Sequence, residues 1–262
     1  MLHFTPLDQP EPAPFERIDG RDDADMLLIC DHASAVIPSH YAELGLATAD
    51  RFAHVAWDIG AAEVTRGLAR RLGCPAVLGG VSRLVIDCNR QPGDPSSIPA
   101  NSCGVPVPGN ANLDEAEADA RAERWFWPYH QEIGTQLAHL FRRGTVPAMV
   151  SVHSFTPCMG SAARPWHVGV LSNRDVRMSE PVLRALRARP DLVVGDNQPY
   201  SAREINYTLD THAGAAGLPH VSFEIRQDLV ADAPSCAAWA DLLAEVLAPV
   251  LADPALRRVQ VF

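Results

Sequence analysis

Histidines and acidic residues follow three apolar runs that lie far apart in the chain. Residues 26–30 run into His32, residues 146–150 run into His153, and residues 221–223 run into Glu224. Short apolar runs bounded by polar residues are typical of buried strands. Ligands bind at the carboxyl ends of strands in open α/β sheets, so the three runs predict one site where these side chains converge.

The residue types favour metal-assisted hydrolysis. Two imidazoles and one carboxylate form a common catalytic zinc site, in which water takes the fourth position. Zinc lowers the pKa of that water and polarises a carbonyl oxygen, while a separate carboxylate moves the proton to the leaving nitrogen. Arginine binds a substrate carboxylate through paired hydrogen bonds, and Arg83, Arg90 and Arg226 stand near the predicted strand ends. The set fits cleavage of an amide bond in a small acidic substrate.

Asp58 stands just before a segment with helical spacing of apolar residues, 59–72, which Gly73 and Pro75 end. From local sequence alone two interpretations stay open, a helix-capping carboxylate and a metal ligand. The chain contains no H-E-x-x-H pattern. His32 also has no glutamate three residues later, since Ala35 stands there.

The elements that position these residues alternate between strand and helix. Further strands are predicted at 75–78, 84–86 and 167–171, and helices at 113–143, 180–189 and 235–251, with Pro128 breaking or kinking the first helix. The alternation predicts one α/β domain with a mixed, mostly parallel sheet and helices on both faces. Residues 1–25 are expected to form an N-terminal arm and 26–262 the catalytic domain. The Pro- and Gly-rich stretch 91–112 is expected to be a loop that forms a lid or rim.

Composition narrows the function classes. The chain has 262 residues and a formal net charge of −10, which argues against a nucleic-acid partner. No signal peptide and no apolar run of membrane-spanning length is recognised. The six cysteines include no C-x-x-C pair, so reduced thiols and a cytoplasmic location are expected.

The chain resembles the N-formylglutamate amidohydrolase family, and more distantly zinc carboxypeptidases and aspartoacylases. The blocks that carry the resemblance are, in chain order, 31–34, 54–61, 82–90, 128–130, 152–157, 164–166 and 223–229. The resemblance implies a zinc-carboxypeptidase-like (phosphorylase/hydrolase-like) fold and one zinc ion, with other divalent metals open. It also implies cleavage of the amide bond of an N-acyl amino acid such as N-formylglutamate.

The resemblance also implies a role for each matched residue. His32 and His153 are metal ligands, and Glu224 is the general base. Asn89 and Arg90 bind a substrate carboxylate, assisted by Arg83. Asp58 is preferred as the third ligand over Asp31 and His54, because Asp31 and His32 would point to opposite faces of an extended strand.

Two other functions remain open. The same centre could serve a metal-dependent peptidase or amidase acting on a larger acidic peptide, with the loop 91–112 shaping a groove. A non-catalytic relative that binds carboxylates is the third hypothesis. The expected partner is a small acidic N-acyl amino acid, without a nucleic acid or a membrane, and the sequence does not determine the oligomeric state.

Overall fold

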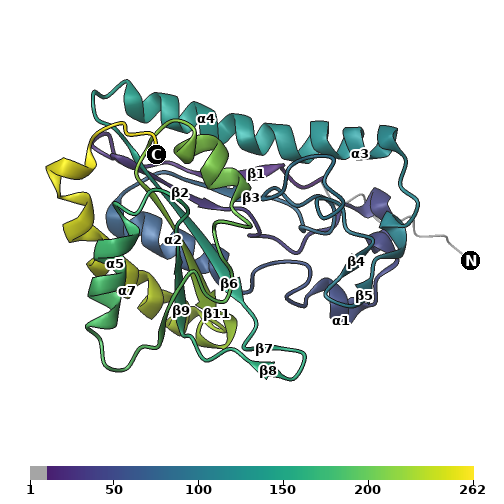
Figure 1. Ribbon diagram of the computed structural model, residues 1–262. Coiled ribbons are helices and arrows are strands. Elements are labelled where there is room, and N and C mark those ends of the chain that lie inside the picture. Colours follow the sequence, from purple (N-terminus) through teal and green to yellow (C-terminus); the bar gives the residue numbers. More distant parts are fainter. Residues whose placement is uncertain (1–10) are drawn as a thin grey trace, which may run out of the picture.

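The computed structural model describes residues 11–262, which form a seven-stranded sheet with helices on both faces (Figure 1). The strand order is β1-β3-β2-β6-β11-β9-β10. The bounds of these strands are β1 Phe15–Ile18, β2 Met26–Cys30, β3 Ala76–Gly79, β6 Ala148–Phe155, β9 Val168–Leu171, β10 Val194–Asp196 and β11 His220–Arg226. β1 pairs antiparallel with β3, and β9 with β11, while the other neighbours are parallel. The expected mixed, mostly parallel sheet is confirmed.

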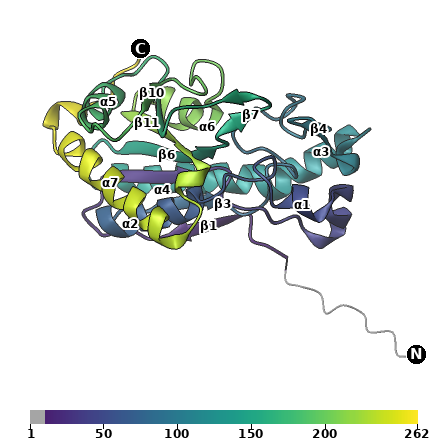
Figure 2. The ribbon, with the colours of Figure 1, turned by 90° about the horizontal axis from the view of Figure 1, so that it is seen from below.

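The helices cover the two faces of this sheet. Their bounds are α1 Thr48–Arg51, α2 Ala61–Leu72, α3 Glu115–Arg121, α4 Trp127–Phe141, α5 Ser179–Arg187, α6 Tyr207–Leu209 and α7 Ala233–Leu251. α4 packs on β2 and β3, and α2 packs on β2, β3, β6 and α7. Figure 2 shows α2 and α7 side by side, on the face of the sheet opposite α4. Two short hairpins lie outside the main sheet, β4–β5 (Asn101–Ser102 and Val105–Pro106) and β7–β8 (Cys158–Met159 and Ala162–Ala163). Short 3-10 or π-helical segments lie at Ser39–Gly45, Pro108–Asn110, Ala122–Phe126, Asp210–Gly214, Gln227–Leu229 and Pro254–Leu256.

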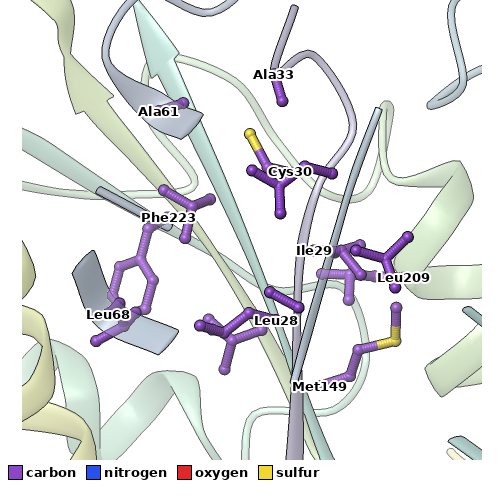
Figure 3. Close-up of a cluster of buried hydrophobic side chains, with 14 of the residues drawn as sticks. Leu28, Ile29, Cys30, Ala33, Ala61, Leu68, Met149, Leu209 and Phe223 are labelled. Atoms are coloured by element: carbon purple, nitrogen blue, oxygen red, sulfur yellow. The ribbon is translucent and has the colours of Figure 1, made fainter. Parts of the chain in front are cut away.

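The core lies around the central strands. All residues of β2 and β6 are buried, as expected of parallel strands that are covered on both faces. Figure 3 shows Leu28, Met149 and Phe223 of the sheet in one cluster with Leu68 of α2 and Leu209 of α6. Each such side chain contributes about 1.5–3 kcal/mol through its burial, so the strands that end at the candidate site are firmly held.

Three predicted elements differ from the structure. Residues 15–18, inside the predicted arm, form the edge strand β1, because pairing with β3 satisfies their backbone groups. Residues 84–86 form turns instead of a strand, since Val85 N donates to Ser82 O and Leu84 N donates to Ser82 Oγ. The strand predicted at 146–150 starts and ends later, at Ala148–Phe155, so that His153 lies within β6. Residues 1–10 of the predicted arm lie outside the described residues, and the division of the chain at residue 25 stays a prediction.

Pro128 does not break the helical stretch. It lies in the first turn of α4, directly after a π-helical turn at Ala122–Phe126. In the first turn the missing N–H of proline has no partner to lose, so the helical direction continues from α3 into α4.

α7 is the one helix in residues 11–262 that could cross a membrane by length and composition. This helix corresponds to the one predicted at 235–251, where no run of membrane-spanning length was expected. One side of α7 is buried, through Trp239, Leu243 and Leu247 among others, and α7 packs along α2. This packing accounts for its apolar composition.

Candidate active site with a metal centre

His32, Asp58 and His153 come together at the carboxyl edge of the sheet. His32 follows β2, His153 lies near the end of the neighbouring β6, and Asp58 lies in the turn before α2. All three are buried, and each offers a ligand atom within 4.8 Å of the others. Asp58 Oδ2 lies 2.8 Å from His153 Nδ1 and 3.3 Å from His32 Nδ1. The group could therefore hold a metal ion.

The side chain of Asp58 does not cap α2. Gly60 is the N-cap, and within residues 11–262 no side chain forms a capping hydrogen bond at this helix start. Asp58 Oδ2 accepts a hydrogen bond from Ser154 N at 3.3 Å besides facing the two imidazoles. The helix-cap interpretation of Asp58 is therefore wrong. Gly60 has a φ of +81°, and a Cβ there would lie 2.2 Å from Val230 O, so glycine is needed for this turn.

Both imidazoles are held on their far side. His32 Nε2 lies 2.7 Å from Asp87 Oδ1, and His153 Nε2 lies 2.9 Å from Ser151 Oγ. Asp31 Oδ2 is 3.3 Å from His153 Nε2, but it has no hydrogen bond of good geometry within residues 11–262, so Ser151 is the firmer partner. Metal-bound histidines are commonly oriented by such outer groups. With Nε2 occupied, each Nδ1 faces Asp58, which fits a metal ligand set.

Asp31 and Asp87 form hydrogen bonds around the candidate metal ligands. Asp31 accepts hydrogen bonds from Tyr129 Oη at 3.0 Å and from Thr208 Oγ1 at 2.6 Å. Burial acts to raise the pKa of Asp31, but the two site histidines and Thr208 outweigh it and lower that pKa. Neither Asp31 nor His54 belongs to the candidate ligand group in the described chain.

Arg83 is largely engaged by acidic side chains. Its Nη2 lies 2.6 Å from Asp87 Oδ2, and its Nη1 lies 3.5 Å from Asp58 Oδ1. Burial opposes the charge of Asp87, yet Arg83 and His32 hold its pKa well below the ordinary value. This geometry favours a role in positioning Asp87. The predicted contact of Arg83 with substrate stays a prediction.

Asn89 and Arg90 face the same pocket. Asn89 Oδ1 accepts from Thr208 N at 3.0 Å, which leaves the Nδ2 group of Asn89 as a donor for a ligand. Arg90 Nη1 donates to Asn89 O at 2.9 Å, and among residues 11–262 no carboxylate pairs with Arg90. The pair retains free donors for a substrate carboxylate, and this role stays a prediction.

Glu224 lies next to His153, because β11 and β6 are aligned at these two residues. Its carboxyl group is buried, and its Oε2 has no hydrogen-bond partner within residues 11–262. Burial raises the pKa of Glu224 to about 7, with His153 opposing the shift and Asp58 adding to it. A carboxyl group with a pKa near neutrality is suited to proton transfer.

The site opens into a cavity of about 290 Å³. The loop 91–112 forms part of its wall through residues of and near the β4–β5 hairpin: Ser96, Pro99, Asn101, Ser102 and Cys103. Whether this loop closes over a ligand stays a prediction. Sequence reasoning missed Ser151, Tyr129, Thr208 and Tyr200 as parts of the site. Two of them had a usable signal: Ser151 lies two residues before His153, and residues two apart on a strand share a face, while Tyr129 lies in the matched block 128–130.

The fold and the buried His-Asp-His group define an α/β protein with a candidate metal site at the carboxyl edge of its sheet. Residues 24–231 match the model of the N-formylglutamate amidohydrolase family, and the chain belongs to this family. The resemblance found in the sequence is confirmed, and membership indicates a hydrolase acting on amide bonds.

Two solved structures are similar over most of the chain. Gene product Atu2144 from Agrobacterium tumefaciens is 36% identical, with a TM-score of 0.88 over 91% of this chain and 95% of that one. N-formylglutamate amidohydrolase from Ralstonia eutropha JMP134 is 18% identical, with a TM-score of 0.67 over 91% and 98%, and supports the fold alone. An aspartoacylase family protein from Mesorhizobium loti has a TM-score of 0.35 at 12% identity over 98% and 71%, too low to carry an argument. A comparison with curated proteins found no match.

Proposed function

We propose that the protein is a zinc-dependent amidohydrolase that cleaves the amide bond of an N-acyl amino acid such as N-formylglutamate. The observation that carries the proposal is the buried His32, Asp58 and His153 group, with a carboxyl oxygen of Glu224 beside it that has no hydrogen-bond partner in the described part of the chain. In this proposal the three residues of the group hold the ion. Asn89 and Arg90 bind a carboxylate of the substrate.

A bound zinc ion supplies an acidified water and polarises the scissile carbonyl. Glu224 would take up the proton of the attacking water and pass it to the leaving nitrogen, since within residues 11–262 its Oε2 is buried and has no hydrogen-bond partner. Asn89 Nδ2 and the free donors of Arg90 orient the substrate carboxylate. Arg83 assists by holding Asp87, which in turn holds the ring of His32.

The cavity volume favours a small acid over a long peptide. We also place the protein in the cytoplasm. All six cysteines, which lie in the described part of the chain, are free thiols, in keeping with a reducing compartment.

Metal analysis combined with a substrate panel tests the proposal. The purified protein should contain about one equivalent of zinc, and should hydrolyse N-formylglutamate with a higher kcat/KM than short acidic peptides. Zinc below about a tenth of an equivalent, with no activity restored by zinc, manganese or cobalt, would contradict it. Faster cleavage of the peptides would favour the peptidase hypothesis. Binding of N-formylglutamate without turnover would favour the non-catalytic one.

A further inference from the structure

A second arginine without an acidic partner lies behind one wall of the active-site cavity. Arg164 Nη1 donates to Tyr200 Oη at 3.0 Å and to the backbone oxygen of Thr156 at 3.4 Å. Within residues 11–262 no carboxylate forms an ion pair with Arg164. By comparison, the guanidinium of Arg83 is paired with Asp87. The charge of Arg164 is therefore not neutralised locally.

The side chain of Arg164 touches residues that line the cavity. Its guanidinium carbon lies 4.9 Å from the ring centre of Tyr200 and 5.9 Å from that of Phe155. Tyr200, Phe155 and Thr156 all line the cavity. Arg164 thus supports this wall from behind and places positive charge next to the space that a ligand would fill.

Tyr200 presents a hydroxyl donor at this wall. Because Tyr200 Oη accepts from Arg164, its own hydrogen is free to donate to a ligand. Burial raises the pKa of Tyr200, and the charge of Glu224 adds to the shift, so the phenol keeps its proton at neutral pH. A hydroxyl polarised by a guanidinium is a good donor to an anion.

The two sets of anion-binding groups belong to segments that lie on opposite sides of the central strands of the sheet. Asn89 and Arg90 belong to the segment that follows β3, whereas Arg164 precedes β9 and Tyr200 follows β10. In the sheet, β2, β6 and β11 lie between β3 and the β9–β10 pair. Asn89, Arg90 and Tyr200 nevertheless line the same cavity as His153 and Glu224, so one ligand could present a negative group to each set.

We propose that Tyr200, held by Arg164, binds a second carboxylate of the substrate, so that the site selects N-acyl dicarboxylic amino acids over N-acyl monocarboxylic ones. Tyr200 is the contact residue, and Arg164 is a positioning residue that polarises its hydroxyl. The inference rests on the proposed function and adds to it the group that recognises the second charge.

The test compares N-formylglutamate with its two monoamides, N-formylglutamine and N-formylisoglutamine, in zinc-loaded wild type, Arg164→Gln and Tyr200→Phe. The two variants should lose about 10- to 100-fold in kcat/KM on the diacid, chiefly through KM. They should lose little on the monoamide that lacks the carboxylate bound at this wall. Arg164→Lys should recover part of the loss. The matched control is Arg142→Gln, an exposed arginine after α4, which should behave as wild type.

Equal losses of kcat/KM on all three compounds, or no loss on the diacid, would overturn the proposal. Arg164 would then only stabilise the contact between two loops. If zinc-loaded wild type hydrolyses none of the three, the proposed function fails, and equilibrium binding then tests this wall separately. Glutarate should bind more weakly to Arg164→Gln than to wild type, while glutaramate should not change. Parallel changes for the two probes would overturn the inference. Matching thermal melts of all variants exclude misfolding as the cause.

Discussion

His153 is held from two directions, and these contacts orient its imidazole toward the candidate metal site. The ring bonds to Ser151 Oγ through Nε2 and faces Asp58 through Nδ1. Its backbone lies inside β6, between β2 and β11. Neither the ring nor its strand has freedom to turn, so the donor atom is already oriented before a ligand arrives.

Glu224 is the residue whose substitution separates chemistry from binding. Glu224→Gln keeps size and polarity but cannot take up a proton, so turnover should fall by about 10²- to 10⁴-fold. Zinc content should stay at the wild-type level, because Glu224 is not in the candidate ligand group. Steady-state kinetics and metal analysis of the same preparation measure both effects. Glu180→Gln, at an exposed position of α5, is the matched control. Full turnover by Glu224→Gln would remove this residue from the mechanism.

At the scale of elements, the contact between α2 and α7 supports the turn that carries Asp58. Gly67 of α2 lies against Ala240 of α7, where a Cβ on Gly67 would be 2.8 Å from the Cβ of Ala240. Ala240 is fully buried, so neither helix can move aside freely. The close approach of these two helices depends on the missing side chain.

Gly67→Ala should therefore destabilise the protein, by about 1–3 kcal/mol through overpacking. The opposite is expected from helix propensity alone, which favours alanine over glycine by about 1 kcal/mol. Adding Ala240→Gly should restore part of the loss by returning the space. Urea unfolding of the two single variants and the double variant measures the coupling. A stabilised Gly67→Ala protein would show that the helices separate without cost.

At the scale of the whole molecule, a pair of histidines joins three distant segments. His130 of α4 donates from Nε2 to Cys88 O at 2.9 Å, so its Nδ1 accepts from His212 Nε2 at 2.8 Å. His212 lies in the π-helical turn after α6. This arrangement needs a neutral His130, because its Nδ1 is the acceptor. Burial, together with the nearby His130, lowers the pKa of His212 to about 4.

Stability should therefore depend on pH in a defined window. In the unfolded chain His212 has the ordinary pKa of 6.5, whereas in the folded protein its pKa is about 4. Between these values the unfolded state binds more protons, so the free energy of unfolding is fully retained above the window and falls as pH falls through it. The slope is at most about 1.4 kcal/mol per pH unit for one proton.

His212→Gln should flatten this pH dependence, as measured by urea unfolding at several pH values. His139→Gln, at an exposed position of α4, should leave the dependence unchanged. An identical slope in wild type and His212→Gln would mean that other groups control the acid response.

The sequence by itself determined the class of fold and the residues around which the site is built. Continuous apolar runs identified β2, β6 and β11 because central strands of a parallel sheet are buried on both faces. The polar residues at their ends pointed to His32, His153 and Glu224, and the family resemblance extended this to Asp58, Asn89 and Arg90.

Only the tertiary structure decided how those side chains are held. The carboxylate of Asp58 faces the imidazoles and does not cap its own helix, and the guanidinium of Arg83 pairs with Asp87. Thr208 and Tyr200 reach the site from segments with no local pattern, and Tyr129 reaches it from a predicted helix whose spacing does not indicate a site contact. Such contacts form only when distant segments pack against one another, so they cannot be predicted from the spacing of residues along the chain.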